Sequence, residues 1–230
     1  MRLSCLIFNV TALALVTAGP LRAEDAVNSL VYVVTYFEAA APAVAQAAAL
    51  SRQFAETSRN EPGNAGFEAL EEIGRPSRFA TFEAWRDKAA FDAHRASAGA
   101  TSFHDELQPT LVGPFETRLF GALSVGASSA QGGGGTVYVL THVDVFPANK
   151  NQAVELVKSV AEAGRKDSGN LFFDVLQWDG HPNHFTLVEE WRDRKAFDAT
   201  LMAAYTREFR RKLTPLEGAL YDERLYQAVR

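Results

Sequence analysis

The sequence Glu83-Ala-Trp-Arg-Asp87 returns 106 residues later as Glu189-Glu-Trp-Arg-Asp193. The same offset aligns Val31-Tyr-Val-Val-Thr35 with Val137-Tyr-Val-Leu-Thr141, and about a third of the positions between 31 and 120 match their counterparts without a gap. Unrelated stretches rarely agree over such a length, and a fixed internal period is the signature of a repeated structural unit. The sequence therefore predicts two copies of one domain, at residues 28–121 and 136–230.

The segment between the copies has the composition of a linker. Residues 122–135 include Ser128-Ser-Ala-Gln-Gly-Gly-Gly-Gly135, and Gly and Ser at this density form a flexible chain. A coil of this length reaches only about 20 Å. The two copies are therefore expected to lie close enough to pack on each other.

Each copy alternates strand-like and helix-like patterns. In the first copy a β-rich run is followed by an Ala-rich stretch with an apolar stripe, then by two strand-like runs joined by a turn, a helix that Asp87 caps, and a last strand. This order, β-α-β-β-α-β, is typical of the ferredoxin-like motif. The predicted strands and helices span residues 30–37, 42–59, 67–73, 78–85, 87–97, 101–107 and 115–120.

The predicted strands carry apolar side chains on both faces. Helices cover only one face of such a sheet, and an exposed apolar face costs roughly 25 cal/mol for each Å². The strand at 79–85, Phe-Ala-Thr-Phe-Glu-Ala-Trp, shows this pattern clearly. The fold class predicted is therefore α+β, with two tandem ferredoxin-like domains packed sheet to sheet, so that one copy serves as the dimer partner of the other.

The N-terminus has the pattern of an export signal. Arg2 precedes an apolar stretch from Leu6 to Val16, Gly19 and Pro20 follow, and Ala23 stands before Glu24. The alternative is a membrane anchor, but the apolar stretch is shorter than the roughly 20 residues that cross a bilayer. We expect a signal peptide at 1–23, a periplasmic or secreted protein, and no membrane insertion after cleavage.

Composition excludes several partners. The formal net charge is −5, and no long basic run is present, so nucleic acid is not an expected partner. The single cysteine, Cys5, lies in the predicted signal segment, which leaves the mature chain without disulfides or thiolate metal sites. The sequence also lacks a phosphate-binding glycine loop and a dinucleotide fingerprint.

The first copy contains a longer motif around its strand-to-helix corner. Glu83-Ala-Trp85 ends a strand, Phe91 and His94 follow on a helix, and Ser97 and His104 come next. This pattern resembles the signature of the antibiotic biosynthesis monooxygenase family, which includes small quinol monooxygenases and haem-degrading relatives. His104 comes later than in the commonest quinol-type pattern. The resemblance covers both copies and implies a dimeric α/β barrel, here with both halves in one chain.

The resemblance implies an activity. Members of this family oxidise electron-rich aromatics such as quinols with dioxygen and without a cofactor, so a small aromatic substrate and dioxygen are the expected partners. A base removes a phenolic proton, and the anion passes an electron to dioxygen. Two alternatives stay open: a non-catalytic small-molecule-binding protein of the same fold, and a haem-binding or haem-degrading protein. No metal site is predicted, and further association between chains is left open.

His94 is the candidate catalytic base, because the histidine pKa lies near 6.5; the alternative is a histidine that packs on the helix surface. The substrate-binding candidates are Tyr36, Trp85, Phe91, His104 and His142. Trp85 is equally suited to a place in the core, and Tyr36 and His142 to ordinary sheet packing. In the haem-degrading branch a histidine near the position of His104 binds iron.

The second copy lacks these histidines. Thr200 and Arg210 stand where the first copy has His94 and His104. Any activity that depends on histidine is therefore expected in the first copy, and the second is expected to complete the barrel. His181 and His184 flank the second hairpin, but two histidines on an exposed turn without a third ligand do not predict a metal site.

Overall fold

The computed structural model describes residues 30–126 and 133–230. The predicted signal peptide and residues 127–132 of the predicted linker lie outside the described residues. The first copy contains β1 (Val31–Glu38), α2 (Val44–Ser58), β2 (Asn64–Glu72), β3 (Arg78–Trp85), α3 (Lys88–Arg95), α4 (Ala98–Leu107) and β4 (Glu116–Ser124). The second contains β5 (Val137–Asp144), α5 (Lys150–Gly164), β6 (Asn170–Trp178), β7 (His184–Trp191), α6 (Arg194–Leu201), α7 (Ala204–Leu213) and β8 (Asp222–Ala228).

Both copies follow the predicted β-α-β-β-α-β order, with the second helical region split into two helices. Single turns of 3₁₀ helix flank the long helices: η1 (Ala41–Ala43), η2 (Gln108–Thr110), η3 (Pro147–Asn149) and η4 (Thr214–Leu216). Strand β4 continues to Ser124, three residues into the stretch predicted as linker, because its end pairs with β6 of the other copy.

The strands of the two copies join into one closed barrel, in the order β1-β3-β2-β8-β5-β7-β6-β4. Two equivalent seams close it. Strand β2 pairs with β8, with Leu70 opposite Ala228, and β4 pairs with β6, with Phe120 opposite Trp178. Among the described strands, this closure leaves no free sheet edge. The predicted fold class is confirmed, and edge pairing joins the two sheets.

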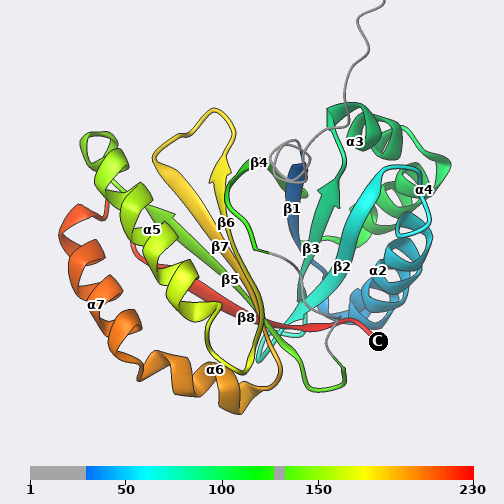
Figure 1. Ribbon diagram of the computed structural model, residues 1–230. Helices are drawn as coiled ribbons and strands as arrows, with labels where there is room; N and C mark the ends of the chain where they lie inside the picture. The colour runs from blue at the N-terminus through cyan, green and yellow to red at the C-terminus, as the bar shows by residue number, and fades with distance from the viewer. Residues whose placement is uncertain (1–29, 127–132) are drawn as a thin grey trace, which may run out of the picture.

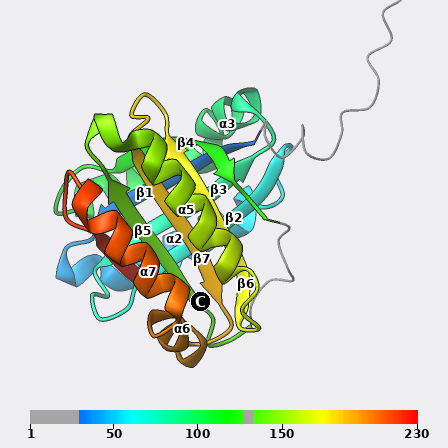
Figure 2. The same cartoon turned by 60° about the vertical axis from the view of Figure 1, so that its left-hand side comes forward.

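Side chains alternate between the barrel interior and the helices. Along β1, Val34 and Tyr36 belong to the interior cluster, whereas Val33 and Phe37 pack under the helices of the first copy. Figure 1 shows α2, α3 and α4 on one side of the strands and α5, α6 and α7 on the other, and Figure 2 shows α5 and α7 lying across the outer face of the second copy. The second apolar face of each sheet is thus buried inside the barrel.

The repeated corner motif has a local explanation. The Asp87 carboxylate accepts a hydrogen bond from the Ala90 amide at 2.8 Å and starts α3, and Asp193 does the same for α6. Gly63 lies so close to α3 that an added Cβ would stand 2.6 Å from the Ala90 Cβ, and Gly63 also has a positive φ of 86°. A larger side chain would push the helix away.

Candidate active site

A cavity of about 270 Å³ lies in the first copy, between the sheet and its covering helices. Threonine hydroxyls and one carboxylate stand on the sheet side, aromatic rings form the walls, and two histidines and an arginine come from α3 and α4. The residues that line it are Thr35, Phe54, Thr81, Glu83, Phe91, His94, Arg95, Ala100, Phe103, His104 and Thr117. Three of the predicted site residues, Phe91, His94 and His104, therefore meet here.

His94 lies at the end of α3 between two carboxylates. Its Nδ1 is 3.0 Å from Glu61 Oε2, and its Nε2 is 3.6 Å from Glu83 Oε2. A carboxylate accepts hydrogen bonds, so in this pair the imidazole N–H at Nδ1 is the donor and Glu61 Oε2 is the acceptor. The ring is 3% exposed and is held with Nε2 toward Glu83. This is the geometry in which a second group orients a proton-transferring imidazole.

Glu83 is the buried carboxylate of the cavity. The Trp85 indole donates a hydrogen bond to Oε2 at 2.9 Å, and the Thr81 hydroxyl donates to Oε1 at 3.0 Å. Burial raises the pKa of Glu83, and the neighbouring His94 partly opposes that rise. A carboxylate and an imidazole thus lie side by side in a place where either can exchange a proton with a ligand.

Aromatic rings fix the imidazole in place. Trp85 stacks on His94 with 4.4 Å between ring centroids, and Phe54 stacks nearby at 5.3 Å. Trp85 is fully buried behind His94, so it supports the imidazole and is not among the residues that line the cavity. His104 stands at the cavity wall against Phe115, at 4.4 Å between centroids, and burial lowers its pKa.

Tyr36 and His142 lie away from this cavity, which corrects their assignment to the same site as His94. Thr35 faces the cavity, and because successive strand residues point to opposite faces, Tyr36 faces the barrel interior. There the Tyr36 hydroxyl and His142 Nε2 share a buried hydrogen bond of 2.9 Å. Burial and the nearby Arg118 lower the pKa of His142 to about 4, and burial raises the pKa of Tyr36. Both groups are neutral near pH 7.

Sequence reasoning assigned no role to Glu61, Glu83 or the three threonines. The sequence did contain a signal for Glu83. The pair Glu83 and Trp85 is repeated as Glu189 and Trp191, and residues two apart on a strand point to the same face of the sheet. Thr35 and Thr117, whose hydroxyls are 3.0 Å apart, come from neighbouring strands. Glu61 lies in a loop 33 residues before His94, and no spacing rule links the two.

The equivalent region of the second copy is filled. Tyr205 stands where the first copy has Gly99, and its hydroxyl bonds both Asp167 and Thr200, the counterparts of Glu61 and His94. The Arg210 guanidinium lies 3.3 Å from the centre of the Tyr221 ring. Only about 20 Å³ of free volume remains. Without a histidine beside it, the buried Glu189 has its pKa raised to about 8. Of these two equivalent regions, only the one in the first copy has room for a ligand.

Other histidines and acidic residues of the described chain do not form a second candidate site. His181 and His184 pack around Trp178, with ring centroids 4.3 and 5.5 Å from the indole. Within residues 30–126 and 133–230, no three His, Cys, Asp or Glu side chains are grouped so that they could hold a metal ion. Over the same ranges, no helix is long and apolar enough to cross a membrane.

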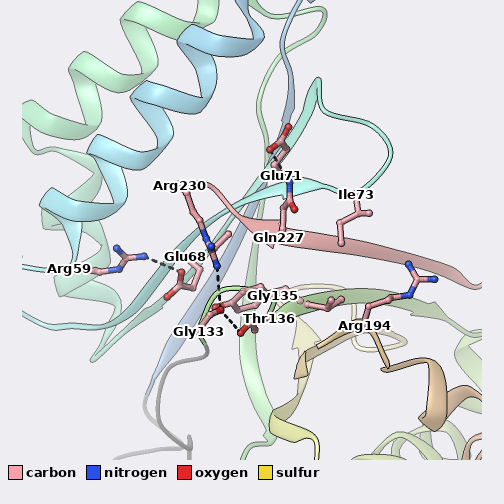
Figure 3. Close-up of a pocket in the computed structure, with 13 residues that line it drawn as sticks. Arg59, Glu68, Glu71, Ile73, Gly133, Gly135, Thr136, Arg194, Gln227 and Arg230 are labelled. Atoms are coloured by element: carbon pink, nitrogen blue, oxygen red, sulfur yellow. Dashed lines mark hydrogen bonds and ion pairs between the residues drawn. The ribbon is translucent and has the colours of Figure 1, made fainter. Parts of the chain in front are cut away.

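A larger cavity, of about 610 Å³, lies where β2 and β8 meet the start of β5 (Figure 3). Its wall is mostly polar: Arg59 pairs with Glu68 at 3.0 Å, and Arg230 reaches the Gly133 carbonyl. None of the predicted site residues lines it. Volume alone therefore does not mark the chemical site, and the smaller cavity around His94 remains the candidate.

Comparison with known proteins identifies the family. Residues 30–106 and 136–212 each match the antibiotic biosynthesis monooxygenase family. The two matches cover most of the chain, and this protein therefore belongs to the antibiotic biosynthesis monooxygenase family, as a tandem duplication of its domain. An uncharacterized protein of Synechocystis sp. is 33% identical over 72 residues, which are 31% of this chain and 49% of that protein. The match spans about half the length of that relative.

Solved structures share the complete fold. A protein from Fusobacterium nucleatum, provisionally called a monooxygenase, matches with a TM-score of 0.81 at 17% identity, covering 88% of this chain and 93% of its own. A provisional monooxygenase from Lactobacillus acidophilus gives 0.74 at 14% identity, with 88% and 95% covered. An anthrone oxidase-like protein gives 0.66 at 13% identity, with 88% and 92% covered. At these identities the likeness shows the fold.

Proposed function

We propose that this protein is an exported, cofactor-independent monooxygenase that oxidises a quinol or a similar electron-rich aromatic compound with dioxygen. The observation that carries the proposal is the arrangement of His94 between Glu61 and Glu83 at an aromatic-walled cavity in the first copy. A planar phenolic ring suits a cavity of this size, with its hydroxyl toward the carboxylate and the threonines.

The first step is the loss of a hydroxyl proton from the substrate. His94 Nε2 and Glu83 stand 3.6 Å apart and together accept this proton, while Glu61 holds Nδ1 and keeps the imidazole oriented. The hydroxyls of Thr35, Thr81 and Thr117 supply hydrogen bonds to the resulting anion. Phe54 and Phe91 pack against the ring and exclude water.

The substrate supplies the electrons. The phenolate gives one electron to dioxygen, the two radicals combine at a ring carbon, and the peroxide then loses water. For a quinol with a free ring C–H, one oxygen atom enters the ring, the other leaves as water, and the product is a hydroxyquinone. Atoms and electrons balance without an added reductant, so the proposed reaction needs no cofactor.

The size of the cavity favours a compact ligand. At about 270 Å³ it lies just below the usual range of roughly 300–1,000 Å³ for drug-sized molecules. A haem macrocycle held by His104 would need the helices to open, because Phe103 and Phe115 both pack against that imidazole. One or two fused aromatic rings need no such movement.

Oxygen uptake by the signal-free protein tests this function. The probes are reduced benzoquinols, reduced naphthoquinols and an anthrone, the last because one structural neighbour is described as anthrone oxidase-like. We expect uptake above autoxidation that falls by about 10²–10⁴-fold in His94→Ala. The matched control is Thr200→Ala, the same position of the second copy, which should keep full activity.

The outcomes separate the alternatives. Uptake that survives His94→Ala contradicts the proposed base. Binding of the probes without uptake supports a non-catalytic binding protein instead. A Soret band on haem titration that disappears in His104→Ala supports a haem protein.

Export has its own test. The proposal predicts that the protein expressed from its full sequence in a Gram-negative host is found in the periplasm and begins at or near Glu24. N-terminal sequencing of the purified protein measures this, and an intact N-terminus in the membrane fraction would support an anchor.

A further inference from the structure

The interior of the barrel contains a second group of polar residues, which the proposed reaction does not use. Arg118 and Arg224 occupy equivalent positions in β4 and β8, and their guanidinium carbons lie 5.8 and 5.7 Å from the centre of the Tyr36 ring. His142 is the counterpart of Tyr36 and is bonded to it. The two ends of this arrangement began as copies of each other, so any difference between them has arisen after the duplication.

The two ends differ in what covers each arginine. At one end Trp178 stacks on Arg118, with 4.7 Å from the guanidinium carbon to the ring centre. At the other end the residue equivalent to Trp178 is Glu72. An indole is replaced by a smaller carboxylate, and a cleft of about 260 Å³ is present at this end, lined in part by Glu72, Arg224, Tyr226 and Tyr36.

Most charged groups in this cleft already have partners. Glu38 pairs with Arg78 at 3.2 Å, and Glu116 pairs with Arg118. Arg224 pairs with Asp222 at 2.5 Å. An anionic ligand would therefore have to compete with the carboxylate that Arg224 already binds.

Glu72 has one distant ion-pair partner, Arg75. It is 9% exposed, and its Oε2 has no hydrogen-bond partner among the described residues. Its Oε1 is 3.7 Å from the largely exposed Arg75 side chain, which is too long for a hydrogen bond. A buried carboxylate oxygen without a donor costs free energy, so a ligand in the adjoining cleft that supplied a donor would be stabilised there.

We propose that this cleft is a second small-molecule site and that it binds a primary ammonium group attached to a small apolar or aromatic body. The ammonium group donates to Glu72, and the ring of Tyr226 provides a face that attracts a cation. The site is distinct from the His94 cavity, because Thr35 lines the latter and the neighbouring Tyr36 lines the cleft, on the opposite face of β1.

Calorimetric titration of the signal-free protein with benzylamine at pH 7 tests the site, with benzyl alcohol as the uncharged probe. We expect benzylamine to bind at least tenfold more tightly than benzyl alcohol. Glu72→Gln should weaken benzylamine at least tenfold and leave benzyl alcohol unchanged. Glu155→Gln, which removes the same charge from an exposed position on α5, should have no effect on either probe.

Two more variants keep the test decisive. Glu72→Trp, which places at this end the residue found at position 178, should abolish benzylamine binding by filling the cleft. His94→Ala should leave it intact, so failure of the proposed oxygenase does not affect this result. Absence of benzylamine binding, equal binding by Glu72→Gln, or loss of binding in His94→Ala would each overturn the proposal.

Thermal unfolding without a ligand adds an independent readout. If Glu72 serves a ligand, Glu72→Gln should unfold at the same temperature as the wild type or higher, because the orphaned charge is removed. A clear fall in the unfolding temperature would mean that Glu72 holds the fold together, and would also overturn the proposal.

Discussion

Tyr36 and His142 stand at equivalent positions of the two copies, 106 residues apart in sequence, and share a hydrogen bond of 2.9 Å inside the barrel. A single-domain relative that formed a symmetric dimer would place two identical residues here. The duplication allows the two to differ, and here a phenol and a neutral imidazole share the bond. Because both copies belong to one chain, equivalent positions in the barrel interior can carry different residues although the fold itself is symmetric.

The buried His142 of this pair predicts that the folding stability of the protein decreases as the pH falls. The pKa of His142 is lowered to about 4 in the folded protein, so between pH 6.5 and 4 the unfolded chain takes up a proton that the native state does not. Stability contributed by the neutral histidine is therefore lost as pH falls, by up to about 3 kcal/mol. Urea unfolding at several pH values should show a shallower decline in His142→Gln than in the wild type. Equal slopes in the two proteins would contradict the buried neutral histidine.

The two buried glutamates should respond to the same substitution by different amounts. Glu189 has its pKa raised to about 8, so the native state holds a proton that the unfolded chain loses from about pH 4.5 upward, and stability falls as pH rises toward 8. Glu189→Gln should therefore stabilise the protein by about 1–3 kcal/mol at pH 8. Burial also raises the pKa of Glu83, but the neighbouring His94 opposes that rise, so Glu83→Gln should stabilise the protein less. Chemical denaturation of both variants at pH 8 measures this, and equal effects would refute the difference between the copies.

Gly99 lies on α4 at the position where the second copy has a tyrosine that fills its cavity. Its counterpart Tyr205 fills the second copy, and a Cβ at Gly99 would meet nothing closer than the Ser97 hydroxyl, at 3.8 Å. Gly99→Tyr should therefore fold, because a glycine within a helix costs stability, and should reduce oxygen uptake at least tenfold by occupying the space beside His94. Gly99→Ala is the matched control and should remain active. A fully active Gly99→Tyr variant would show that the substrate binds elsewhere.

Glu61 is expected to act through His94, as a positioning residue. Glu61→Gln keeps the shape and removes the charge that faces Nδ1, so we expect the maximal rate to fall roughly tenfold or more while KM changes little. The pH dependence of the rate should shift at the same time. Asp167→Asn, at the equivalent position of the second copy, serves as the control for a change of loop charge. A larger KM with an unchanged rate would assign Glu61 to substrate binding.

Much of the fold follows from patterns that the sequence displays. The 106-residue period, the two-sided apolar strands and the Asp87 cap are local or periodic features, and the structure confirms the architecture that they predict. The length of β4 was underestimated because Ala122 and Ser124 have no strand pattern of their own and are held by pairing with β6. That pairing depends on the other copy and has no local signal.

The site was predictable only in part. Phe91, His94 and His104 share one helical region, so a motif along the chain brings them together. Tyr36 was misplaced because the direction of a strand residue depends on which face is covered by helices, and both faces of β1 are apolar. Glu61 was missed because its contact with His94 joins a loop to a helix end, and such contacts are set by tertiary packing.

The most direct test of the central claim is the fate of the oxygen atoms. Turnover of the best quinol probe under ¹⁸O₂ should place one labelled atom in the hydroxyquinone and the other in water, and His94→Ala should reduce this labelled product by about 10²–10⁴-fold. Unlabelled quinone formed together with hydrogen peroxide, or labelled product at an unchanged rate in His94→Ala, would contradict a monooxygenase centred on His94.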